Sequence, residues 1–168
     1  MEKIFTLVFV FVFSISLNAQ KIENVYWGSA LGMSSEQVLE NLGNQNLDAI
    51  VDESGIYLQN VELAEIVFST VGMKFTANDE FYNVFGYNKF KSRKEAQAAF
   101  DDSLSKLRLK YPKIQSMSKS DNCLCLYAYT DDGHENVLSL GLYKGNGGAY
   151  FVRLNVYSDY LVRRNREE

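Results

Sequence analysis

The side chains best suited to chemistry in this sequence lie close together, in the stretches "DNCLCLYAY" and "TDDGHEN". They include the two cysteines, Cys123 and Cys125, and the only histidine, His134. A thiol beside an imidazole can act as a nucleophile or bind a soft metal ion. Residues two apart in a strand have Cα atoms about 6.5–7 Å apart, at the outer limit for a disulfide. The spacing therefore favours half-buried thiols on one strand face, with a strained bridge or a soft-metal site as open alternatives.

The acidic residues of "TDDGHEN" could also bind a metal ion, but their pattern indicates a turn. Asp131 and Asp132 precede a glycine between two predicted strands, and the calcium-loop pattern of an EF-hand is missing. The sequence contains no G-x-S-x-G motif whose serine could pair with His134, which disfavours a serine hydrolase. We therefore predict no catalytic residue, no metal ligand, no cofactor-binding residue and no cofactor. A cysteine-dependent enzyme that uses Cys123 or Cys125 remains the enzymatic alternative.

The glycine-rich stretch "WGSALGMSSEQVLENLG" could be a phosphate loop, but its spacing is wrong. Gly28 and Gly32 are four residues apart and no lysine follows them, so neither phosphate-binding fingerprint is present. Ser34 and Gln37 instead form the S-x-x-Q capping box that begins a helix. The stretch predicts a short helix over about 35–42, closed by Gly43 in the left-handed conformation.

A second helix is predicted over about 93–111. Ser92 and Glu95 form another capping box, and Pro112 stops the helix. Apolar residues recur between them at the three- and four-residue spacing of one helix face, at Ala96, Phe100, Leu104, Leu107 and Tyr111. We expect this face to cover one side of a sheet.

The remaining chain reads as antiparallel strands over 56–76, 78–90, 122–130, 136–144 and 149–157, with a hairpin turn at Asn78-Asp79. A three-residue loop over 146–148 brings the aliphatic faces of the last two strands into phase. It pairs Leu142 with Val152, Leu140 with Leu154, and Leu138 with Val156. The predicted fold class is α+β: an antiparallel sheet with both helices packed on one face.

The other face of this sheet mixes aromatic and polar residues, as partner-binding surfaces do. The alternative interpretation is that these aromatic residues only pair across strands or pack under loops. The predicted partner-binding face consists of Tyr127, Tyr129, Tyr143, Phe151, Arg153 and Tyr157.

The first stretch, "MEKIFTLVFVFVFSISLNAQ", has the layout of a secretory signal peptide over 1–19, with cleavage after Ala19. Residues 20–168 are then expected to form a single domain that is exported to the bacterial periplasm or beyond the cell. No cysteine near the cut could take a lipid, and no transmembrane segment is expected after cleavage. The net charge of −4 makes nucleic acid a poor partner, and the basic stretches over 89–94 and 163–166 are interpreted as solvated.

The opening stretch also resembles a family. Its Gly32-Met33-Ser34 turn, followed by Val38 and Leu42 on a helix, looks like the start of the BamE (SmpA/OmlA) outer-membrane assembly lipoproteins and of the β-lactamase-inhibitor-protein-like domains. The helix ending "LRLKYP" and the closing "VRLNVYSDYL" are similar to secreted proteins of Bacteroidetes-type bacteria. The chain lacks the lipid-bearing cysteine of the assembly lipoproteins. The resemblance implies an exported, non-enzymatic domain that binds another envelope or extracellular protein; a small-ligand or lipid carrier is the alternative.

Overall fold

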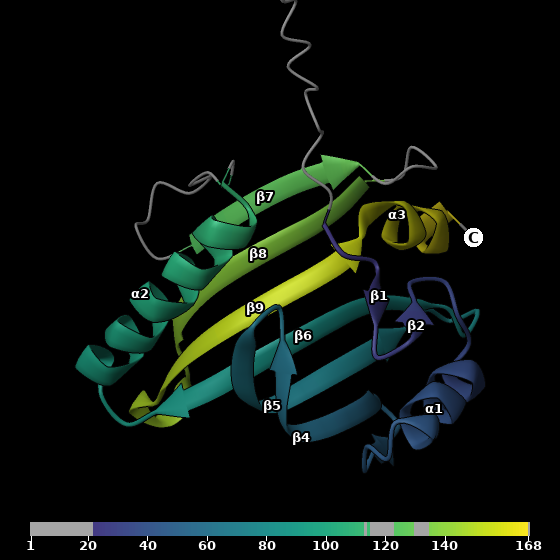
Figure 1. Ribbon diagram of the computed structural model, residues 1–168, viewed down its shortest axis with the longest axis horizontal. Coiled ribbons are helices and arrows are strands. Elements are labelled where there is room, and N and C mark those ends of the chain that lie inside the picture. Colours follow the sequence, from purple (N-terminus) through teal and green to yellow (C-terminus); the bar gives the residue numbers. More distant parts are fainter. Residues whose placement is uncertain (1–21, 113, 115–122, 130–134, 168) are drawn as a thin grey trace, which may run out of the picture.

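The computed structural model describes residues 22–112, 114, 123–129 and 135–167, and for 123–129, Glu135 and Glu167 it describes the backbone alone. In this part of the chain a seven-stranded antiparallel sheet has the order β3-β4-β5-β6-β9-β8-β7, and β1-β2 form a small separate ribbon (Figure 1). The α+β fold class is confirmed. The elements are β1 (Val25–Tyr26), β2 (Ser29–Ala30), α1 (Ser35–Asn44), β3 (Ile50–Asp52), β4 (Gly55–Leu63), β5 (Ile66–Phe75), β6 (Phe81–Phe90), α2 (Arg93–Lys110), β7 (Cys123–Tyr129), β8 (Glu135–Lys144), η1 (Asn146–Gly148), β9 (Tyr150–Ser158) and α3 (Asp159–Glu167).

The register predicted for β8 and β9 is confirmed. Leu138 pairs with Val156, Leu140 with Leu154, and Leu142 with Val152. The loop between the strands is η1, in which Gly147 has a φ of 77°, a conformation that glycine adopts without steric penalty. Turn chemistry and face alternation therefore suffice to align this hairpin.

Both capping boxes are present, but the end of α1 differs from the prediction. Gln37 donates its backbone N–H to the Ser34 hydroxyl, and Glu95 does the same to Ser92. Helix α1 continues to Asn44, with Gly43 inside the helix, so the prediction of Gly43 as a left-handed cap is wrong. The left-handed residue is Asn46, which lies in the turn after the helix and has a φ of 55°, a conformation that asparagine tolerates.

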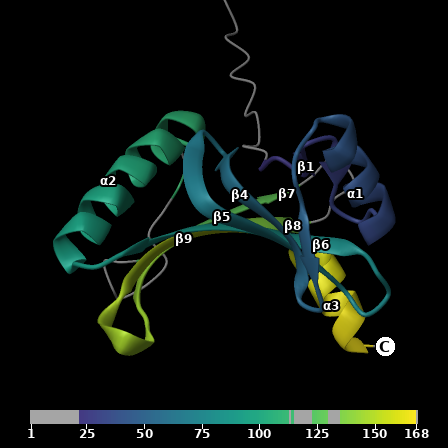
Figure 2. The ribbon, with the colours of Figure 1, turned by 90° about the horizontal axis from the view of Figure 1, so that it is seen from below.

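The main core lies between α2 and the sheet. Figure 2 shows α1 and α2 on one side of the sheet, which we call the inner face, with β4 and β5 curling up on that side. The aliphatic faces of β8 and β9 pack there against the apolar stripe of α2, as predicted. The buried members of this contact include Ala96, Phe100, Leu107, Leu138, Leu140, Leu154 and Val156.

Two features of the fold were not expected. The stretch predicted as strand over 56–76 is two strands, β4 and β5, joined by Ala64 and Glu65, which both have positive φ values of 52° and 66°. After β9, the chain forms α3 on the opposite, outer face of the sheet (Figure 2). Leu161 of α3 is buried, an ion pair joins Arg164 to Glu80, and the Ala77 N–H donates to the Asn165 side chain. These long-range contacts hold a short, highly charged helix that sequence periodicity alone does not indicate.

Candidate functional site

The candidate site is an open groove on the outer face, formed where β6, β9 and β8 lie side by side. Tyr87 pairs with Arg153, and Tyr143 pairs with Phe151. These residues alternate along their strands with buried core residues, so they project from the outer face. Together with Phe85 they line a cavity of about 330 Å³, which we call the outer groove.

The aromatic side chains of the outer groove contact one another in a chain. Phe85 and Tyr87 stack with their ring planes 12° apart and their centroids 6.4 Å apart. Tyr87 meets Phe151 in a T-shaped contact at 6.1 Å, and Tyr57 meets Phe85 in the same manner at 6.4 Å. Offset and edge-on contacts of this kind fix ring orientation, so the walls of the groove are well defined.

Arg153 is the charged residue inside the outer groove. Its Cζ atom lies 4.3 Å from the centroid of the Phe85 ring, within cation–π range. Its Nε atom is buried and has no hydrogen-bond partner in the structure. Within the described part of the chain, no acidic side chain forms an ion pair with Arg153. A buried Nε–H group with no hydrogen-bond partner among the described residues is costly to the fold, and this cost is the feature of the groove that needs an explanation.

The charged residues beside the outer groove are basic. On β8, Lys144 follows Tyr143, whereas Glu135 begins the strand at its other end. Lys74, Lys89 and Arg153 are the charged residues of β5, β6 and β9, and these three strands contain no aspartate or glutamate. The Lys74 Nζ lies 5.8 Å from the Phe85 centroid, and the Lys89 Nζ lies 6.0 Å from that of Phe151. A chain with a net charge of −4 therefore presents a local positive potential at this place.

Two glycines leave space for the rings of Phe85 and Tyr143 on the outer face. A Cβ atom at Gly72 would collide with the Phe85 ring, and one at Gly141 would collide with the Tyr143 ring. Gly141 is also the strand partner of Arg153 on β8. At Gly141, beside Arg153, the absence of a side chain thus leaves the space that the Tyr143 ring occupies.

The structure brings together three of the six residues predicted for the partner-binding face: Tyr143, Phe151 and Arg153. Tyr157 lies at the α3 end of β9 and does not line the groove. Tyr127 and Tyr129 belong to β7, but their side chains lie outside the described residues.

Sequence reasoning missed Phe85 and Tyr87. The alternation of Phe85, Tyr87 and Lys89 along one face of a strand was visible in the sequence. Nothing local could show that β6 pairs with β9.

The residues considered for chemistry are only partly described. The backbone of Cys123 and Cys125 forms the predicted strand, but the thiols and the segment over 130–134, with His134, lie outside the described residues. Among the described residues, no three histidine, cysteine or acidic side chains gather in a group that could hold a metal ion.

The glycine-rich opening is accounted for by local structure. Trp27 and Gly28 form a turn with positive φ between β1 and β2. The Asn41 amide of α1 donates to the Gly28 carbonyl at 3.1 Å and to the Ser29 hydroxyl at 3.2 Å. The stretch thus ties the first ribbon to α1.

A separate group of titratable residues lies at the end of α2. Burial raises the pKa of Tyr26 and of Tyr111, and the nearby charge of Glu23 adds to both shifts. Burial alone would lower the pKa of Lys110, but a hydrogen bond and ion pair with Glu23 at 2.7 Å raise it overall. These contacts fasten α2 to the N-terminal segment, which is a structural role.

No protein-family model, curated protein or solved structure matches this chain. In the described residues no helix is long and apolar enough to cross a membrane. The likeness of the opening stretch to the BamE-type domains therefore stays a prediction, and the function has to be argued from the outer groove.

Proposed function

We propose that this chain is a non-enzymatic, exported binding domain that contacts another envelope or extracellular protein through the outer groove. The observation that carries the proposal is Arg153, held against Phe85 in an aromatic cavity with its Nε buried and unpaired. Arginine, tyrosine and phenylalanine are the residues that protein interfaces favour, and the first two dominate their binding energy.

The distribution of apolar surface also supports binding. The aliphatic inner face is covered by α2 and the N-terminal elements, and α3 covers part of the outer face (Figure 2). Val137 of β8 and Leu161 of α3 are both buried where α3 packs against the sheet. On the outer face Val137 and Leu161 are thus covered, whereas the arginine and its rings lie in an open groove, where Tyr143 remains 44% exposed. Exposed aliphatic side chains elsewhere include Ile50, Val51, Val67 and Leu109.

A small-ligand carrier is the second candidate, because the groove has the volume for a modest ligand. Its size of about 330 Å³ is at the low end for small-molecule sites, which are about 300–1,000 Å³. Native mass spectrometry of the gently purified protein distinguishes the two: a retained non-protein mass favours the carrier. The charged Arg153 argues against a neutral lipid as the cargo.

Site-specific photo-cross-linking in cells tests the proposal. A photoreactive phenylalanine analogue replaces Tyr143 in the groove or, as a control, Leu109 on α2, which is 86% exposed. We expect a discrete cross-linked protein from position 143 and none from position 109. The additional variant Phe151→Ser should abolish the cross-link while leaving thermal unfolding nearly unchanged. Equal cross-linking at both positions, or none at position 143, would contradict the proposal.

A further inference from the structure

We infer that the outer groove recognises an acidic peptide segment of the partner, and that a carboxylate of this segment pairs with the guanidinium of Arg153. The inference rests on the proposed function and adds the chemistry of the ligand. It is carried by the Arg153 Nε, which is buried and has no partner among the described residues, by the sign of the surrounding charge and by the aromatic walls.

The first step is the state of Arg153. The face of its guanidinium contacts Phe85, and this stacking leaves the N–H donors at the edge of the group for a ligand. The Nε atom is buried and has no hydrogen-bond partner among the described residues. A carboxylate accepts two parallel N–H bonds from a guanidinium, and such charge-assisted pairs are among the strongest in proteins. A ligand carboxylate in the open groove would therefore add charge-assisted hydrogen bonds to this guanidinium.

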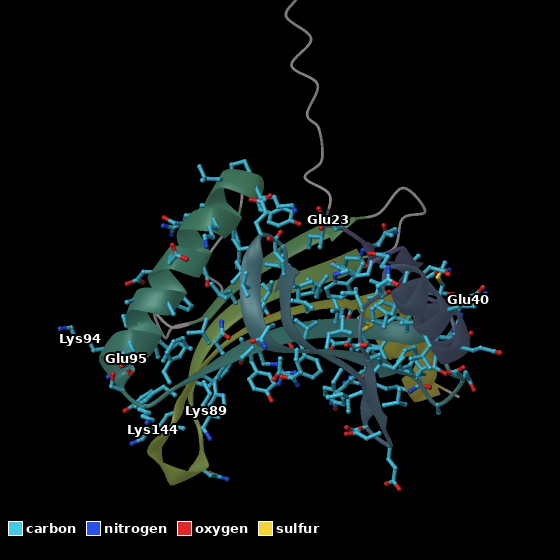
Figure 3. The ribbon with its side chains drawn as sticks, turned by 60° about the horizontal axis from the view of Figure 1, so that its bottom comes forward. Glu23, Glu40, Lys89, Lys94, Glu95 and Lys144 are labelled. Atoms are coloured by element: carbon cyan, nitrogen blue, oxygen red, sulfur yellow. The ribbon has the colours of Figure 1, made fainter. Side chains whose placement is uncertain are left out.

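The second step is the surrounding charge. Lys74 lies over Phe85, the same ring that Arg153 contacts, and Lys89 lies over Phe151 at the next position of the groove. Lys89 and Lys91 also line a second cavity of about 610 Å³ beside Gly147 and Gly148. Figure 3 shows Lys89 and Lys144 at this same end of the sheet. The positive potential thus continues beyond Arg153, which suits an extended ligand with more than one carboxylate.

The third step separates a peptide from a large polyanion. Nucleic acids and anionic membranes gain affinity from many lysine and arginine contacts over an extended surface, and this chain carries a net charge of −4. A short acidic segment meets only the local charge of the groove, because charges beyond about 10 Å are screened at moderate salt. The rings of Tyr87, Tyr143 and Phe151 would then contact the apolar side chains that lie between the carboxylates of a peptide.

Binding of matched synthetic peptides to the purified protein tests the inference. The probe is a short, fluorescently labelled peptide of alternating glutamate and tyrosine, and its control alternates glutamine and tyrosine. Fluorescence anisotropy should show that the glutamine peptide binds at least about tenfold more weakly than the glutamate peptide, because a hydrogen bond to a charged group contributes roughly that factor. Arg153→Gln should bind the glutamate peptide as weakly as the wild type binds the glutamine peptide, and Arg153→Lys should lie between.

The matched control is Arg108→Gln. Arg108 is an exposed residue of α2 on the inner side of the sheet, and the substitution changes the net charge by the same amount. We expect it to bind the glutamate peptide like the wild type. If Arg153→Gln fails to fold, the comparison of the two peptides on the wild type and on Arg153→Lys still decides the question.

Three results would overturn the inference. The first is equal binding of both peptides by the wild type, and the second is unchanged binding by Arg153→Gln. The third is binding, dependent on Arg153, of a polyuronate or of phosphatidylglycerol vesicles without binding of the glutamate peptide. A cross-link at position 143 combined with equal binding of both peptides leaves the proposed protein-binding function standing and removes only its acidic ligand. Absence of that cross-link removes the proposed function itself.

Discussion

Replacing Arg153 by methionine tests whether the arginine serves the fold or a ligand. Methionine keeps an unbranched apolar stem beside the Phe85 ring and removes the guanidinium. Burial of the unpaired Nε costs the native state about 1–3 kcal/mol, which Arg153→Met recovers. The cation–π contact with Phe85, which the variant loses, contributes about 0.5–2 kcal/mol. At the middle of each range the two terms nearly offset each other, so the free energy of unfolding should change by less than about 1 kcal/mol.

Unfolding in guanidinium chloride, followed by far-ultraviolet circular dichroism, measures this change. The comparison variant is Phe100→Ala, whose ring is 2% exposed between α2 and the sheet and should cost about 3–5 kcal/mol. Arg153→Met should have the wild-type midpoint and slope within error, together with loss of glutamate-peptide binding. A loss of stability of more than about 2 kcal/mol in Arg153→Met would show that the arginine supports the fold, and the reasoning from its unpaired state would be refuted.

Two further outcomes are expected. Burial raises the pKa of Tyr26 in the folded state. The folded protein therefore keeps the Tyr26 phenol proton above about pH 10, where an unfolded tyrosine loses it. The contribution of Tyr26 to stability is complete below about pH 10 and falls as the pH rises further. Tyr26→Phe should show a shallower loss of unfolding free energy between neutral and strongly alkaline pH, and an identical slope would contradict this reading. Gly141→Val should displace the Tyr143 ring, and peptide titration should show weaker binding while the α+β circular dichroism spectrum is retained; unchanged affinity would mean that Tyr143 does not shape the groove.

Much of the secondary structure could be predicted because its causes are local. Ser34 and Ser92 each accept a hydrogen bond from a backbone N–H three residues ahead, so a motif of four residues specifies where each helix begins. The pairing of Leu140 with Leu154 follows from a glycine-containing loop and from the period of two along each strand. These signals act over a few residues and need no knowledge of the rest of the fold.

Where the prediction was wrong, a distant contact or an unusual backbone conformation decided the outcome. Ala64 and Glu65 adopt left-handed conformations that cost non-glycine residues roughly 1–2 kcal/mol each, so the turn between β4 and β5 has no typical sequence signature. The compensation comes from the strands on either side, whose residues Leu63 and Ile66 are buried in the core. Helix α3 likewise depends on the burial of Leu161 against the sheet.

The sequence by itself determined the α+β class, the two capped helices and an outer strand face that carries Tyr143, Phe151 and Arg153. Only the tertiary structure decided what surrounds the arginine. Phe85 and Tyr87 reach it because β6 pairs with β9, although α2, β7 and β8 lie between them in the chain. Strand order is set by which faces bury apolar surface together, a property of the whole chain that no short segment encodes. The residues of the groove can therefore be recognised in the sequence one strand at a time, whereas their assembly around the buried Nε of Arg153 is visible only in the folded protein.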